Sequence, residues 1–188
     1  MKTDIHRFFL KFILSFGGSI LVGILFFGSS VFLFAHSAFQ FVGFGIFGAV
    51  ILTSAHLTSP SRSFAVVILA TVLYECALTS FGTRMIFRDV FFLLGIGAMI
   101  VFYCLYFYKN LEAIPVARPL VLAAMLALNG IIITAVLSVV IQFALEGTPV
   151  PFAAIGQNLS LEFLIGIGLG VGDECSELKL LKPKMLPS

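Results

Sequence analysis

Hydrophobic residues follow one another along this chain in long runs that polar residues seldom interrupt. A helix that crosses a bilayer needs about 20 mostly apolar residues, and six runs meet or nearly meet that length. The breaks between the runs carry charge or turn-forming residues. The runs are residues 12–34, 38–57, 64–80, 90–108, 120–144 and 152–172. We therefore expect an all-α integral membrane protein, with six transmembrane helices in a single domain and a tail at 173–188.

The composition excludes a soluble domain. Of the 188 residues, 60% are hydrophobic and 11% are charged, whereas a soluble domain carries about 25% charged residues. So few charges do not cover a surface that faces water. The net charge of +2 is too small for a surface that binds nucleic acid. The lipid bilayer is the expected partner.

Basic residues are distributed unevenly between the two ends of the runs. An even number of spans, here six, places both termini on the same side of the membrane. Nine Lys and Arg residues fall on that side, whereas the other side has two, Arg84 and Arg88. The nine are Lys2, Arg7, Lys11, Arg62, Lys109, Arg118, Lys179, Lys182 and Lys184. Because cytoplasmic loops carry an excess of Lys and Arg, both termini and the tail are predicted to be cytoplasmic. The bacterial inner membrane is the expected location, since nothing resembles a removable organelle-targeting segment.

Inserting a charged side chain at the centre of a membrane helix costs about 2.5–3.5 kcal/mol. Polar and charged residues inside the runs are therefore expected to have a function that offsets this cost. Most of them fall in the outer half of the spans. The candidate binding residues are Glu75, Arg84, Arg88, Asn129, Gln157, Asn158 and Glu162. On the sixth run, Asn158, Glu162, Gly166 and Gly170 recur every four residues and form a stripe that is expected to face the bundle. This pattern predicts a polar cavity that opens outward above an apolar inner half.

Three interpretations of these polar groups stay open. In the first, Glu75 or Glu162 pairs with Arg84 or Arg88 and only stabilises the bundle. In the second, one of the two arginines binds an anionic group of a small molecule, while Glu162 and the amide side chains supply hydrogen bonds. In the third, Glu75 and Glu162 carry protons, because burial disfavours the charged form of a carboxyl group.

Signatures of enzymes and of metal or cofactor sites are missing from the sequence. It contains no nucleophile elbow, zinc-protease helix or phosphate-binding loop. Its three cysteines, Cys76, Cys104 and Cys175, show no metal-ligand spacing. We therefore expect no catalytic residue, metal or cofactor. One alternative is that His36 or His56 supplies a single axial ligand to a pigment or haem held together with a partner subunit.

A small-residue pair on the first run, Ser19xxxGly23, and the overall layout carry a resemblance. Six helices in fewer than 200 residues, cytoplasmic termini and an outward polar pocket resemble the substrate-binding S-components of energy-coupling-factor vitamin transporters. The rod-shape-determining membrane protein MreD is similar in size and span count. Some S-components dock their membrane partner through Ala-x-x-x-Ala on the first helix, so the resemblance implies docking by Ser19 and Gly23. It implies ligand contacts at Asn129, Gln157, Asn158 and Glu162.

These observations favour a membrane subunit that captures or transports a small polar or anionic molecule through an outward-facing pocket. An energised protein partner is implied, because the chain lacks the phosphate-binding loop that nucleotide hydrolysis needs. The alternative is a non-catalytic structural or accessory subunit of a larger membrane complex. In that case, the small-residue faces are contact surfaces for other subunits.

Overall fold

A computed structural model describes residues 2–27, 35–80, 87–144 and 152–181, with side chains described over 5–25, 41–77, 90–136 and 159–178. These residues form α-helices and one short π-helical segment, and no strand occurs among them. The all-α prediction is confirmed. The α-helices are α1 (Lys2–Phe27), α3 (Ala35–Leu57), α4 (Pro60–Ser80), α5 (Phe87–Phe102), α6 (Ala117–Ala144) and α7 (Phe152–Leu181).

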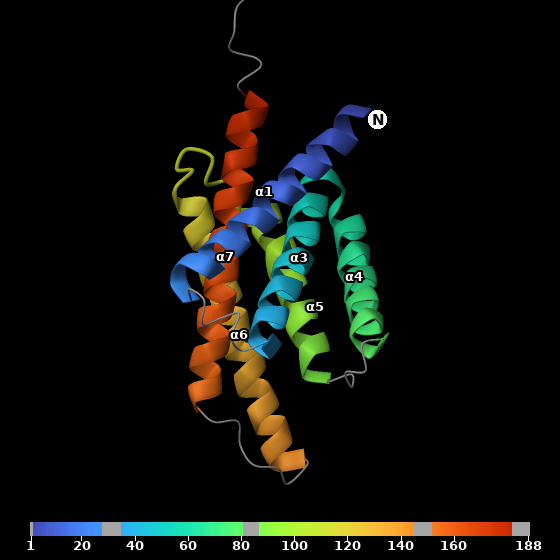
Figure 1. The fold of residues 1–188 in the computed structure, drawn as a ribbon, viewed down its shortest axis with the longest axis vertical. Coiled ribbons are helices and arrows are strands. Elements are labelled where there is room, and N and C mark those ends of the chain that lie inside the picture. The colour runs from blue at the N-terminus through green and yellow to red at the C-terminus, as the bar shows by residue number, and fades with distance from the viewer. Residues whose placement is uncertain (1, 28–34, 81–86, 145–151, 182–188) are drawn as a thin grey trace, which may run out of the picture.

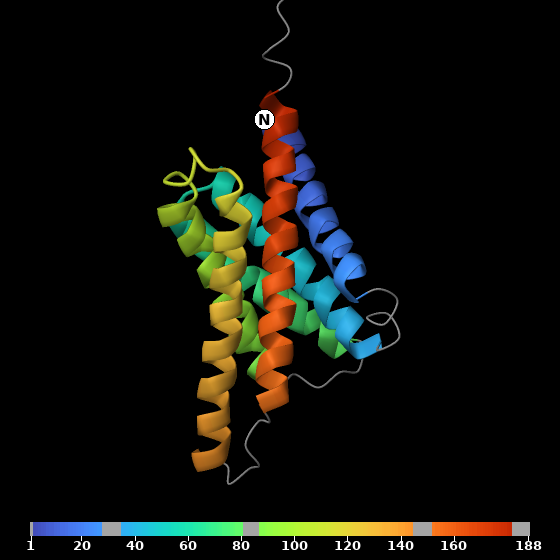
Figure 2. The same ribbon diagram turned by 90° about the vertical axis from the view of Figure 1, so that its left-hand side faces the viewer.

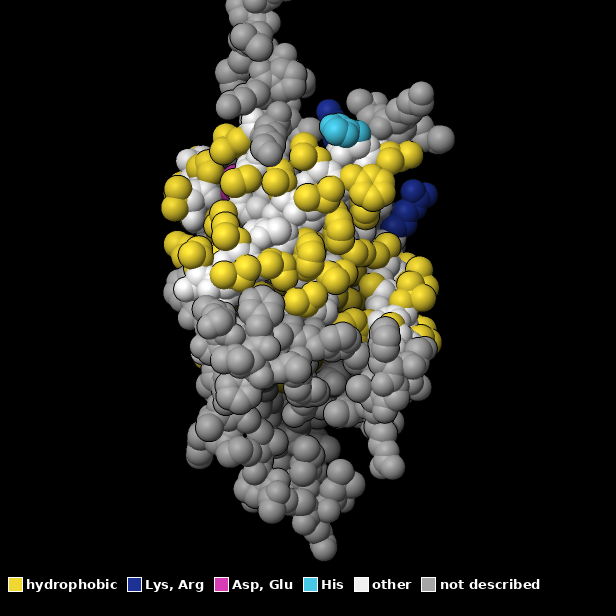
Figure 3. Space-filling view, viewed as in Figure 1, with side chains coloured by type: hydrophobic (Ala, Val, Ile, Leu, Met, Phe, Trp, Pro, Cys, Tyr) yellow, Lys and Arg dark blue, Asp and Glu magenta, His cyan; other side chains and the backbone are white. Residues whose placement is uncertain are grey.

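Four stretches within the described helices are long and apolar enough to cross a membrane. They are Ile5–Leu25, Pro60–Ala77, Val90–Phe107 and Ala117–Val136, and α3 adds a shorter apolar stretch at Phe41–Leu57. Many large hydrophobic side chains on these helices remain exposed on the outside of the bundle, and Figure 3 shows hydrophobic side chains spread over the described part of one face. Lipid is the medium that matches such a surface. The chain is a helical membrane protein.

Helix α7 is the central element of the bundle. It lies against α1 on one side and α6 on the other, and it also contacts α3. Figure 2 shows α6 and α7 side by side in opposite directions, and Figure 1 shows α1 crossing α7 obliquely. Helix α3 packs on α1, α4 and α5 as well, whereas α4 packs on α3 and α5 at the edge. Fully buried side chains such as Leu52, Ile96, Leu126 and Leu169 fill the space between α3, α5, α6 and α7.

Small residues allow α1 to approach the backbone of α7 closely. A Cβ atom added at Gly168 would collide with the backbone of Gly18 and Ser19, and one added at Gly172 would collide with the backbone of Leu14. Without side chains at these two positions, the backbones come into direct contact. This crossing holds the first and last helices of the chain together.

A second glycine face on α7 packs against α6. A Cβ atom at Gly166 would lie 2.5 Å from Cα of Ala123, and one at Gly170 would lie 2.6 Å from Cα of Pro119. Glu162, one turn before Gly166, also contacts α6 (see below). The expected stripe of Glu162, Gly166 and Gly170 therefore does face the bundle, against α6.

The structure differs from the predicted spans where helices end. Helix α1 begins at Lys2 instead of near residue 12, and α7 continues past residue 172 to Leu181. Helix α5 passes into the π-helix η1 (Tyr103–Phe107), in which Tyr108 N–H donates to the carbonyl of Tyr103 at 3.0 Å. The wider π turn inserts one residue and rotates the side chains that follow it. These extensions bring charged residues of distant segments to one end of the bundle.

Candidate functional site

A buried polar pair lies where α5, α6 and α7 meet. Asn129 Nδ2 donates a hydrogen bond to Glu162 Oε2 at 3.0 Å, and the two residues are 2% and 1% exposed. Gly95 on α5 leaves room for the pair, because a Cβ atom there would collide with the Asn129 amide. The second oxygen of Glu162, Oε1, accepts no hydrogen bond of good geometry from the described residues, although the backbone N–H of Gly130 lies close to the carboxyl group. Two of the predicted site residues are therefore together in the bundle interior.

The other predicted site residues are not assembled around this pair by the described part of the chain. Glu75 is buried on α4, which packs mainly on α3 and α5. Arg84 lies outside the described residues. Arg88, Gln157 and Asn158 belong to helices α5 and α7, but their side chains are outside the described set. The outward pocket thus remains a prediction.

The predicted docking residues pack within this chain. Ser19 is fully buried against Gly168 of α7 and against Gly45 of α3. Gly23 lies under the ring of Phe41, which a Cβ atom at position 23 would meet at 2.5 Å. This face of α1 is therefore filled by the chain's own helices α3 and α7.

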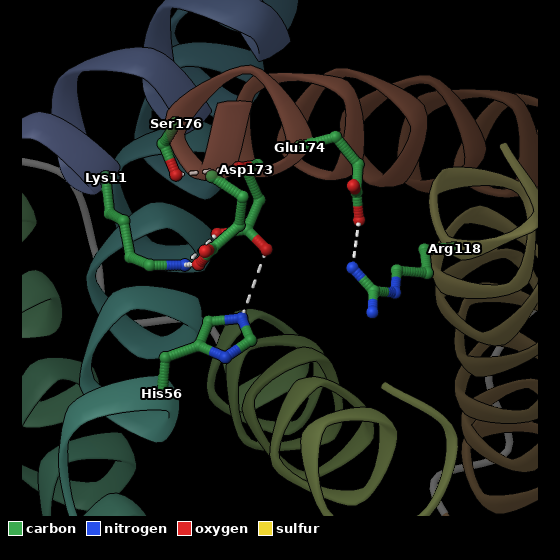
Figure 4. A network of polar contacts seen from close by, with 7 residues as sticks. Lys11, His56, Arg118, Asp173, Glu174 and Ser176 are labelled. Carbon is green, nitrogen blue, oxygen red and sulfur yellow. Dashed lines mark hydrogen bonds and ion pairs between the residues drawn. The ribbon is translucent and has the colours of Figure 1, made fainter. Parts of the chain in front are cut away.

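A second polar group, which we term the terminal cluster, lies at the end of the bundle where α1 begins and α7 ends (Figure 4). It consists of Lys11, His56, Arg118, Asp173, Glu174 and Glu177. Lys11 Nζ donates to Asp173 Oδ1 at 2.9 Å and also pairs with Glu177. Nε2 of His56 lies 3.1 Å from the other Asp173 oxygen. One carboxylate thereby joins α1, α3 and α7.

Tyr108 connects the remaining part of the terminal cluster. Arg118 Nη1 donates to Glu174 Oε1 at 2.9 Å, and its guanidinium group lies 4.2 Å from the centre of the Tyr108 ring. The ring of His56 also contacts the Tyr108 ring, with the ring centroids 4.2 Å apart. Because Tyr108 directly follows η1, the π turn sets the direction of this ring. Through Tyr108, Arg118 of α6 is thus connected to His56 of α3.

Asp173 lies just beyond the predicted sixth span and is 3% exposed. Burial by itself would raise the pKa of Asp173, but the contact with His56 and the charge of Lys11 hold that pKa below its usual value. The carboxylate is therefore ionised and serves as an ion-pair partner. Asp173 is the first residue of the tail predicted at 173–188, yet it is buried in the bundle, because α1 and α3 supply cations that compensate its burial.

Sequence reasoning did not identify the terminal cluster as a site. In the sequence, Lys11 and Arg118 contribute only to the bias of basic residues toward one side, and His56 is singled out only as an alternative haem ligand. One signal was present: Asp173 follows Glu162 by eleven residues, about three helical turns, and so continues the same face of α7. That signal identifies Asp173 but not its partners, because Lys11 lies 162 positions away along the chain.

A cleft opens beside the terminal cluster, lined by parts of α1, α3, α6, α7 and the segment around η1. Among the residues that the structure describes, no cluster of His, Cys, Asp and Glu side chains is suited to hold a metal ion. The chain matches no protein-family model and is similar to no curated protein and to no solved structure.

Proposed function

We propose that the chain is a membrane subunit that captures or transports a small polar or anionic molecule around the Asn129–Glu162 pair. The observation that carries this proposal is the environment of Glu162, a fully buried carboxyl group with one oxygen bonded to an amide and the other without a hydrogen bond of good geometry in the described residues. Leaving a polar atom of this kind without a partner in a bundle interior is costly. A ligand that donates a hydrogen bond to Oε1 would offset that cost.

In this proposal, the protein crosses a bacterial inner membrane six times, with both termini in the cytoplasm. The described basic side chains support this arrangement. Arg7, Lys11, Lys109 and Arg118 all line the cleft at one end of the bundle, and Figure 3 shows Lys, Arg and His side chains toward that end. A concentration of Lys and Arg at one end is typical of the cytoplasmic side. An energised partner completes the proposal, as in the S-components that the layout resembles.

The alternative, an accessory subunit that docks through its small-residue faces, has less support. The glycines of α7 and the Ser19–Gly23 face of α1 are occupied by contacts within the chain. Such a subunit would have to bind its partners through the exposed apolar side chains, which lipid also covers.

Native mass spectrometry of the protein extracted from its own membrane tests the proposal. We expect a small molecule to remain bound to the wild type and to the control variant Arg62→Gln, whose side chain is exposed and does not line the cleft, and to be lost from Glu162→Gln. Equal occupancy in Glu162→Gln would contradict the site. If the wild type instead leaves the membrane as part of a large protein assembly that carries no small molecule, the result would favour the accessory-subunit alternative.

A further inference from the structure

The cleft beside the terminal cluster has the dimensions of a large ligand site. Its volume is about 1530 Å³, above the roughly 300–1,000 Å³ of ordinary small-molecule pockets. The lining comes from the start of α1, the end of α3, the first residue of α4, the π-helical segment and the turns after it, the start of α6 and the end of α7. The cleft therefore lies at the ends of the apolar stretches, where a bilayer meets water.

One wall of this cleft is apolar and exposed. Leu57, Leu105, Leu120 and Val171 all line it, and they are 39%, 43%, 53% and 43% exposed. Contact with water is unfavourable for such a wall, at about 25 cal/mol for each Å² of apolar surface. An occupant with hydrocarbon chains would remove this surface from water.

The rim of the cleft carries exposed charges of both signs. Arg7, Lys109 and Glu112 line it, and none of them forms an ion pair with another described residue. Arg118 lies in the wall, only 7% exposed, and its Nε–H has no acceptor among the described residues. The remaining carboxylates of the lining, Glu174 and Glu177, are paired with Arg118 and Lys11. Within the described part of the chain, the cleft thus presents cations without an ion-pair partner and one carboxylate without such a partner.

We propose that this cleft binds a zwitterionic phospholipid whose headgroup carries a phosphate and a primary amine. Arg7, Lys109 and Arg118 supply donors for the phosphate, and Glu112 accepts hydrogen bonds from the ammonium group. The acyl chains lie along the apolar wall. An anionic headgroup without an amine would leave Glu112 beside a negative charge, and a choline headgroup has no N–H to donate. This lipid site is separate from the Asn129–Glu162 pair and goes beyond the proposed function.

Lipid retention measured by native mass spectrometry tests this assignment. The protein is stripped of lipid in detergent and exposed to phosphatidylethanolamine, phosphatidylglycerol or phosphatidylcholine with identical acyl chains. We expect phosphatidylethanolamine to be retained about tenfold more strongly than the other two. Lys109→Gln is expected to weaken retention of all three lipids, whereas Glu112→Gln is expected to abolish the preference for phosphatidylethanolamine over phosphatidylcholine. Both side chains are exposed, so both variants are expected to fold.

The matched control is Arg62→Gln, because Arg62 is exposed near the start of α4 but does not line the cleft. Equal retention of the three lipids, or a preference for phosphatidylglycerol, would overturn the proposal. A loss in Arg62→Gln as large as that in Lys109→Gln would overturn it as well, since binding would then reflect general charge. Competition by soluble glycerophosphoethanolamine as effective as competition by the intact lipid would overturn the role of the apolar wall and with it the lipid as ligand.

Discussion

Lys11, His56 and Asp173 come from three helices, and their charged ends meet in a space that water scarcely reaches. A buried charge without a partner is unstable in such a place, whereas a paired and hydrogen-bonded charge is tolerated. Lys11 is only 4% exposed, and the two carboxylates that pair with it in the described part of the chain, Asp173 and Glu177, belong to α7. Each of these residues therefore depends on the others for its burial.

Replacing Lys11 by methionine leaves two carboxylates facing an apolar side chain. We expect Lys11→Met to lower the free energy of unfolding by about 3–5 kcal/mol, the usual cost of removing one partner of a buried ion pair. Thermal unfolding in detergent measures the effect. Lys109→Met is the matched control, because Lys109 is exposed and its replacement is expected to change stability by about 0.5 kcal/mol or less. Equal losses in the two variants would contradict a stabilising ion pair at Lys11.

Acid weakens the same ion pairs. Because the pKa of Asp173 is lower in the folded state than in an unfolded chain, its contribution to stability is present above the usual aspartate pKa of about 3.9. That contribution is lost as the pH falls through the lowered value. We expect the unfolding temperature of the wild type to drop between pH 5 and pH 2.5, and to drop less in Asp173→Asn. Identical pH profiles would show that Asp173 does not carry the acid sensitivity.

At the scale of elements, α7 is organised by two sets of glycines on different faces. Gly166 and Gly170 admit α6, and Gly168 and Gly172 admit α1. Close packing without large side chains is a main source of helix association in lipid, where the hydrophobic effect between helices is absent. The position of α1 against α7 also determines whether Lys11 reaches Asp173.

Gly168→Ala tests the contact between α1 and α7. Its added methyl group would collide with the backbone of Ser19, and backbone atoms give way less easily than a flexible side chain. We expect a loss of about 1–3 kcal/mol in thermal unfolding experiments. Gly17→Ala is the control, since a Cβ atom at Gly17 has no neighbour within 4 Å, and we expect it to be neutral or to stabilise by up to about 1 kcal/mol. A neutral Gly168→Ala would contradict the close crossing.

At the scale of the whole molecule, the start of α1 and the end of α7 lie at the same end of the bundle, as the pairing of Lys11 with Asp173 shows (Figure 1). This proximity agrees with an even number of spans. With the bias of Lys and Arg toward that end, it predicts that the terminal cluster and the cleft beside it face the cytoplasm.

Labelling with a membrane-impermeant maleimide tests this orientation. Cys175 on α7 is exposed and lines the cleft. In a variant that keeps Cys175 alone, we expect labelling in inverted vesicles and none in intact cells. The reverse pattern is expected for His36→Cys in a background without other cysteines, because position 36 is predicted to lie on the outer side. Labelling of Cys175 in intact cells would reverse the proposed topology.

The sequence by itself determined that the chain is a bundle of membrane helices, and it placed the helices to within a few turns. This information is local, because the length of each apolar run sets whether it crosses a bilayer, whatever its neighbours are. The periodicity of the sixth run likewise predicted that Glu162, Gly166 and Gly170 face inward, as they do against α6. For Asn129 and Glu162, burial followed from their position in the runs.

Only the tertiary structure decided which polar groups meet. The predicted sixth span ended before Asp173 because a charge is normally unfavourable in a bilayer, but α1 and α3 bring Lys11 and His56 against that carboxylate and make its burial tolerable. The small-residue pair of Ser19 and Gly23 was compatible both with a partner subunit and with the chain's own helices. A four-residue spacing specifies a surface for close packing but not its occupant, because the occupant depends on how distant segments are arranged in space.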